Sequence, residues 1–118
     1  MESARIDGYS PGHVTVDGVE HTRDVIVLPD RVVANWWRRD GHSLALEDLD
    51  DVIDELPERL IVGCGYAGRL EPDPGVVEAL SRRGTELEAL PTDAAVARYQ
   101  ELAAVNPAAI AAALHLTC

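Results

Sequence analysis

Apolar and polar residues alternate most clearly near the amino end of the chain. Residues 13–22, HVTVDGVEHT, carry this alternation on both sides of Asp17-Gly18. An Asp-Gly pair favours the positive φ angles of a tight hairpin turn. The pattern therefore predicts an antiparallel hairpin.

Four other segments predict strands. DVIVLP at 24–29 has four consecutive apolar residues before Pro29, which indicates a strand covered on both faces. VVANWW predicts a strand at 32–37, RLIVG predicts a short buried strand at 59–63, and TELEAL at 85–90 alternates until Pro91.

Three segments have a helical period. The first runs from Leu46 to Leu56 and ends at Pro57, with its apolar stripe opposite a run of Asp and Glu. The second begins at Asp73-Pro74 and ends near Gly84. The third follows Pro91, with Thr92 as its expected N-cap, and its apolar side consists of Val96, Tyr99, Leu102 and Ala103.

The order strand, helix, strand, helix from residue 58 onward predicts an α/β fold with a parallel portion, to which the hairpin adds an antiparallel piece. With 118 residues, no repeat and no low-complexity linker, the chain is expected to be a single domain over 1–118. The tail NPAAIAAALHLTC predicts a helix from its alanine content alone.

Charge narrows the classes of function. The net charge is −11, and all ten basic residues are Arg. Such a surface repels phosphate backbones and anionic lipid, so we expect neither nucleic-acid nor membrane binding. The first residues carry no apolar leader, which favours a cytoplasmic location. In that reducing compartment, Cys64 and Cys118 are expected to remain thiols.

Five stretches occur in the same order as in a known family: DVIVLPDRV, GHSLALEDLDDVI, LIVGCGYAGRL, LPTDAAVARYQEL and AALHLTC. From about residue 6 to 118 the chain resembles a small α/β domain of unknown function first defined on a methanogen protein. Eukaryotic relatives include an adipogenesis-associated protein and mitochondrial complex I assembly factor 3. The resemblance implies a three-layer domain around a central mixed sheet, with helices packed on it and 109–116 as a final strand. Tyr99-Gln100 departs from the family's usual Tyr-Asn.

The loop from Gly63 to Gly68 has the spacing G-x-G-x-x-G after a predicted strand. A dinucleotide site needs a helix to open directly at such a turn, but here the helix can begin only near Pro74. No suitably placed acidic residue follows as a ribose ligand, so we expect no NAD site and no other cofactor.

Two interpretations of this loop remain. Gly63 and Gly65 can serve a sharp turn at a strand end. Alternatively, the loop can form a small-molecule or anion pocket with Cys64, Tyr66 and Arg69, because ligands collect at strand ends in α/β sheets. The Thr92 corner and the tail from His115 to Cys118 would complete that pocket.

The cysteines and histidines give weaker signals. His115 and Cys118 are three residues apart, with His42 and Cys64 as conceivable further ligands, but residues three apart in a strand point to opposite faces, so no metal site is expected. Cys64 could be a nucleophile with His13, His21, His42 or His115 as its base. A buried small thiol is the favoured interpretation, and no catalytic residue is assigned.

Two surface features suggest protein contacts. The acidic run over 47–55 predicts a solvated helix face or a docking surface for a basic partner. At Trp36-Trp37, strand alternation predicts one buried and one exposed indole, and an exposed Trp beside Arg38 and Arg39 is a plausible contact anchor.

Two hypotheses follow. The favoured one is a non-catalytic cytoplasmic domain that acts through contacts with an as yet unidentified protein, like the assembly-factor branch of the family. The alternative is a ligand-binding protein or enzyme with its pocket at residues 63–69.

Overall fold

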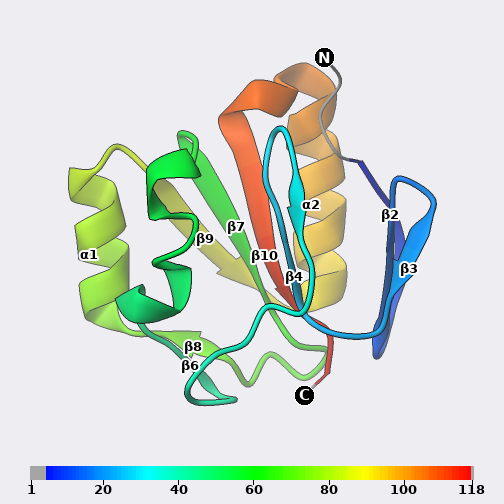
Figure 1. The fold of residues 1–118 in the computed structure, drawn as a ribbon, viewed down its shortest axis with the longest axis horizontal. Helices are drawn as coiled ribbons and strands as arrows, with labels where there is room; N and C mark the ends of the chain where they lie inside the picture. Colours follow the sequence, from blue (N-terminus) through cyan, green and yellow to red (C-terminus); the bar gives the residue numbers. More distant parts are fainter. Residues whose placement is uncertain (1–4, 118) are drawn as a thin grey trace.

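The computed structural model describes residues 5–117, and its centre is a mixed five-stranded sheet (Figure 1). The strand order is β5-β4-β10-β7-β9. The strands β7, β9 and β10 run parallel, while β4 and β5 are antiparallel to their neighbours. Their bounds are β4 (Val25–Val27), β5 (Val32–Val33), β7 (Arg59–Cys64), β9 (Glu86–Leu90) and β10 (Ile110–His115).

A layer covers each face of this sheet, giving the three-layer single α/β domain expected from the family resemblance. On one side lie α2 (Thr92–Val105) and a small antiparallel sheet; on the other lie α1 (Pro74–Arg82) and the 3-10 turns η1 (Leu46–Leu49) and η2 (Ile53–Glu55) (Figure 1). A third 3-10 turn, η3 (Pro107–Ala109), precedes β10.

Alternation along the central strands divides the interior into two cores. In β10, Ile110, Ala112 and Leu114 belong to the core under α2, whereas Ala111 and Ala113 belong to the core under α1. All five side chains are buried, because β10 lies in the middle of the sheet with a layer on each face. Burial in a central strand thus overrides the helix propensity of alanine. The final strand that the family resemblance implies over 109–116 is confirmed, and the helix indicated by alanine content alone is wrong.

The amino end forms the small sheet β1-β2-β3 from β1 (Ile6–Ser10), β2 (His13–Val16) and β3 (Val19–His21). The predicted hairpin is confirmed: β2 pairs with β3 around Asp17 and Gly18, whose φ angles are +50° and +79°. Gln100 at the family's usual Asn position donates from its amide to the Ile6 carbonyl, which ties α2 to β1.

Helix α1 begins at Pro74 and ends in a Schellman motif. The N–H of Thr85 donates to the Leu80 carbonyl, that of Gly84 donates to the Ser81 carbonyl, and Gly84 has a φ of +90°. Both predicted ends of this helix are confirmed. A short parallel pair is formed by β6 (Ser43–Leu44) and β8 (Glu71–Pro72), and β8 ends just before α1 begins.

The helix predicted over 46–56 is wrong in type. The segment forms two separate 3-10 turns, with backbone bonds from Asp50 to Glu47 and from Val52 to Leu49. Asp has a low helix propensity, and like charges at i,i+4 repel, so the acidic run disfavours a continuous α-helix. Leu49 and Val52 of the apolar stripe still turn inward, whereas Leu46 is exposed.

The strand predicted over 32–37 is too long. Only Val32–Val33 pair, because Asn35 takes a left-handed φ of +55° and the Trp36 N–H donates to the Asp24 carbonyl instead of continuing the ladder. No helix among residues 5–117 is long and apolar enough to cross a bilayer.

Candidate functional site

The three segments of the predicted loop pocket meet at the carboxyl edge of β7 and β10. The Gly65 N–H donates to Thr92 Oγ1 at 2.8 Å, and the Thr92 N–H donates to the Gly65 carbonyl at 3.1 Å. The Thr92 hydroxyl in turn donates to the His115 carbonyl. Thr92 is the first residue of α2 and its hydroxyl serves this junction, so the prediction that it caps the helix is wrong.

Most polar groups of this junction are hydrogen-bonded to one another. Besides the Gly65 N–H, the N–H groups of Gly68 and Leu70 bond to the carbonyls of Gly65 and Cys64. The glycines serve the turn itself: Gly65 has a φ of +94°, and a Cβ on Gly63 would lie 2.9 Å from Thr92 Oγ1. Tyr66 and Arg69 extend into solvent.

Cys64 is buried, as predicted, and its thiol donates weakly to the Val62 carbonyl. Burial raises the pKa of this thiol, and the charge of Glu71 adds to that effect. The strand register places His115 beside Cys64. A raised pKa is the opposite of what an activated nucleophile requires.

A buried polar cluster lies at the same edge of the sheet. Asp24 Oδ2 is 2.6 Å from Arg38 Nη1 and 2.8 Å from His115 Nδ1, while Asp24 Oδ1 accepts the Leu116 N–H. Burial of Asp24 opposes its charged form, but the hydrogen bonds from His115, Leu116 and Arg38 outweigh it and hold the Asp24 pKa below its usual value.

His115 Nδ1 also lies 2.9 Å from Arg38 Nη2, so it donates to Asp24 in one tautomer and accepts from Arg38 in the other. Two buried nitrogens, Arg38 Nε and His115 Nε2, have no hydrogen-bond partner among the described residues.

Arg38 also fixes the tryptophan-bearing loop. Its guanidinium lies 4.8 Å from the centre of the Trp36 ring, and Trp36 Nε1 donates to the Asp48 carbonyl at 2.9 Å. Trp36 is 8% exposed and Trp37 is 77% exposed. The expected division into one buried and one exposed indole is confirmed, although a loop and not a strand produces it.

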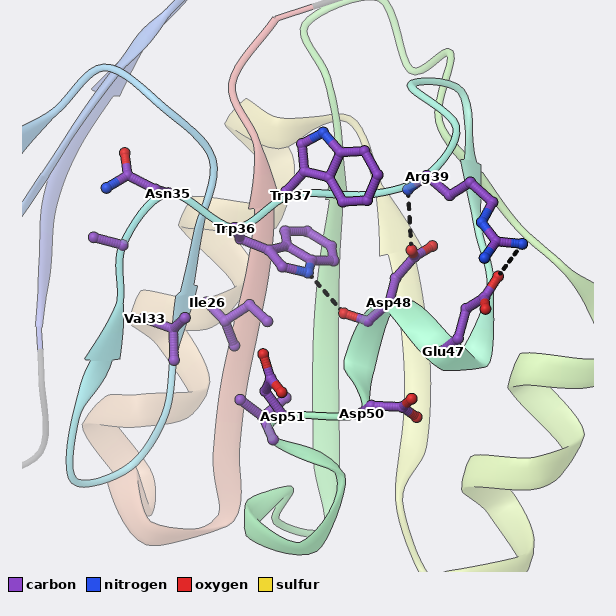
Figure 2. Close-up of a pocket in the computed structure, with 12 residues that line it drawn as sticks. Ile26, Val33, Asn35, Trp36, Trp37, Arg39, Glu47, Asp48, Asp50 and Asp51 are labelled. Atoms are coloured by element: carbon purple, nitrogen blue, oxygen red, sulfur yellow. Dashed lines mark hydrogen bonds and ion pairs between the residues drawn. The ribbon is translucent and has the colours of Figure 1, made fainter.

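Trp36 and Trp37 line a surface hollow of about 500 Å³, which we call the Trp hollow (Figure 2). Figure 2 shows Trp36 lying across its floor, with the turn carrying Asp50 and Asp51 beside it. The lining comprises Ile26, Val33, Ala34, Asn35, Trp36, Trp37, Arg39, Glu47, Asp48, Asp50, Asp51 and Val52.

Sequence reasoning missed Asp24 in this region, and it named Arg38 only as a neighbour of the Trp pair, not as a member of a buried cluster. Both are charged residues with side chains no more than 15% exposed. Their sequence signal is faint: Asp24 directly precedes a buried strand, and Arg38 follows the Trp pair, but only the fold brings them together.

The metal prediction falls partly outside the described residues, since Cys118 is not among them. Within residues 5–117, no three or more His, Cys, Asp or Glu side chains are grouped so that they could hold a metal ion.

The fold and site define a small three-layer α/β domain with a tight glycine turn at one sheet edge and a Trp-lined hollow beside it. Residues 6–115 match the family described as protein of unknown function (DUF498/DUF598). The chain belongs to this family, which confirms the resemblance read from its sequence.

Several solved structures share the fold. The protein MT938 is 28% identical with a TM-score of 0.76, over 98% of this chain and 100% of that one. The conserved hypothetical protein PH1505 from Pyrococcus horikoshii is 26% identical with a TM-score of 0.75, over 97% and 99% of the chains. A protein from Bartonella henselae, described as an outer membrane protein, is 21% identical with a TM-score of 0.80, over 99% and 98%.

Proposed function

We propose that this chain is a non-catalytic cytoplasmic domain that binds a partner protein through the Trp hollow, as the assembly-factor branch of its family suggests. The observation that carries the proposal is Trp37, a large aromatic side chain left 77% exposed at the rim of a hollow. Exposed Trp residues beside a concave surface are typical anchors of protein interfaces.

The surroundings of Trp37 support this role. Trp36 is held by Arg38 and by the Asp48 carbonyl, so the hollow is formed before any partner arrives. A preformed surface loses less conformational entropy on binding than a flexible one. Ile26 and Val52 pack beneath the same lining, each 1% exposed, and Val33, which is half-buried, adds apolar surface to it.

The test is affinity enrichment from an extract of the cells that make the protein, with quantitative comparison of three baits. These are the wild type, Trp37→Ala, and Tyr66→Ala as a matched control, because Tyr66 is an exposed aromatic residue (57%) on the glycine loop. We expect a set of proteins that Trp37→Ala loses and Tyr66→Ala retains. Retention of every protein by Trp37→Ala would contradict the proposal.

A second candidate is a ligand site at the glycine loop. Two observations favour it: residues 63–69, Thr92 and His115 converge, and His115 Nε2 is buried without a partner among the described residues. A ligand at about 100 times its Kd stabilises the folded state by about 2.7 kcal/mol, which a thermal shift detects. Metabolites and nucleotides that leave the Tm unchanged are excluded as ligands.

A further inference from the structure

The Trp hollow combines an apolar floor with a strongly acidic wall. Four carboxylates contribute to its lining against a single guanidinium, that of Arg39. Of the four, Glu47 pairs with Arg39 at 3.2 Å, and Asp48 accepts the N–H groups of Ala45 and Arg39. These two carboxylates are therefore already engaged within the domain.

Asp50 and Asp51 are different. Both side chains are exposed, and within residues 5–117 neither forms a side-chain hydrogen bond or an ion pair. Asp51 acts on Arg31 only through its charge: the Arg31 guanidinium is bound to Glu55, which raises the Arg31 pKa most, and the Asp51 charge adds to that rise. The hollow thus carries unneutralised negative charge on one side.

Trp37 provides a complementary surface for a cation. Its neighbour Trp36 already has the Arg38 guanidinium 4.8 Å from its ring centre, on the inner side of the loop. Indole is the aromatic ring that attracts cations best, and the Trp37 ring is open to solvent.

Resting on the proposed function, we infer that the partner presents a basic segment to the Trp hollow, with one Arg or Lys side chain stacked on Trp37 and a second beside Asp50 and Asp51, which Figure 2 shows on the other side of Trp36. The hydrocarbon stem of the second side chain would lie along the apolar floor while its head remains near the carboxylates. A second copy of this chain is a poor occupant, because its own net charge is −11.

The test uses a displayed random-peptide library selected on the wild-type protein, with each enriched peptide then measured against three variants. Trp37→Ala removes the stacking surface, and Asp50→Asn/Asp51→Asn removes the free charges. Asp30→Asn/Glu58→Gln is the matched control, because it removes two exposed carboxylates outside the hollow. The Tm of each variant verifies that it is folded.

We expect enriched peptides to carry Arg or Lys next to an apolar residue and to bind about tenfold more weakly to Trp37→Ala and to Asp50→Asn/Asp51→Asn. The Asp30→Asn/Glu58→Gln control should bind them as the wild type does. Binding should also weaken when the ionic strength rises from about 0.15 M to about 1 M, which shortens the Debye length from about 8 Å to about 3 Å.

Two other results separate this inference from the proposed function. Peptides that need Trp37 but are not basic, or that ignore Asp50→Asn/Asp51→Asn, would overturn the cationic partner and leave the docking role intact. A selection that yields no peptide dependent on Trp37 would overturn both.

Discussion

Gly63 and Thr92 meet so closely that the strand β7 has no room for a side chain at this point. A Cβ on Gly63 would lie 2.9 Å from Thr92 Oγ1 and 3.0 Å from Leu114 Cδ2, both buried. Gly63→Val should therefore lower the free energy of unfolding by about 1–3 kcal/mol, a fall in Tm of roughly 4–15 °C.

Gly41→Val is the matched control for thermal denaturation, because nothing lies within 4 Å of its Cβ position and its φ is not left-handed. An equal Tm for Gly63→Val and the wild type would show that the strand and α2 can move apart without cost.

The carboxylate of Asp24 also contributes to stability, in a manner that depends on pH. Because the fold depresses its pKa, its contribution is complete above the usual value of 3.8 and is lost as the pH falls through the folded-state value. Asp24→Asn leaves the buried Arg38 without its counter-ion and should cost about 3–5 kcal/mol at pH 7.

Urea denaturation at a series of pH values measures this effect. The difference in the free energy of unfolding between the wild type and Asp24→Asn should become smaller below about pH 4. Glu78→Gln, which breaks an exposed ion pair with Arg82, should cost less than about 1 kcal/mol at pH 7. If this difference in the free energy of unfolding stays constant down to acid pH, the charge of Asp24 is not the source of its contribution to stability.

At the scale of elements, the end of α1 depends on Gly84. Its φ of +90° is costly for any residue with a Cβ, and the position faces open space, so strain is the only penalty. Gly84→Ala should lower the stability by about 1–2 kcal/mol, measured by chemical denaturation. Gly75→Ala, within the same helix and also in open space, should instead be neutral or stabilising.

Some helices, strands and turns of this fold could be predicted from local sequence patterns, and others could not. Local patterns were sufficient for the hairpin at Asp17-Gly18 and for the ends of α1, because turn and cap geometry depends on neighbouring residues. The alanine-rich β10 was assigned correctly only through family resemblance, since its burial on both faces comes from layers formed elsewhere in the chain.

Long-range placement explains what was missed at the site. The Trp pair and the acidic run were each recognised, but their union in one hollow requires the loop over residues 34–42 to fold back onto η1. The Asp24–Arg38 pair joins residues on separate segments through a contact that no local period encodes.

At the scale of the whole molecule, the chain has 21 acidic residues and ten Arg. Repulsion among the excess carboxylates destabilises the compact folded state. Added NaCl screens this repulsion, so the Tm should rise between low ionic strength and about 0.15 M, where the Debye length is about 8 Å. Asp50→Asn/Asp51→Asn removes two charges that form no ion pair within residues 5–117. This variant should have a higher Tm than the wild type at low salt and a smaller rise of Tm with added NaCl. A Tm that falls with salt would mean that surface ion pairs outweigh the repulsion.

Consecutive placement of a buried and an exposed indole gives the protein two fluorescent reporters of opposite sensitivity. Trp36, stacked near Arg38 in the interior, changes its emission when the domain unfolds, whereas Trp37 responds when something covers the hollow. Replacing Trp37 with Phe leaves Trp36 as the single Trp of the sequence and so isolates the interior signal. Intrinsic fluorescence can therefore follow both the folding of the domain and the binding of a partner at the Trp hollow, without an attached label.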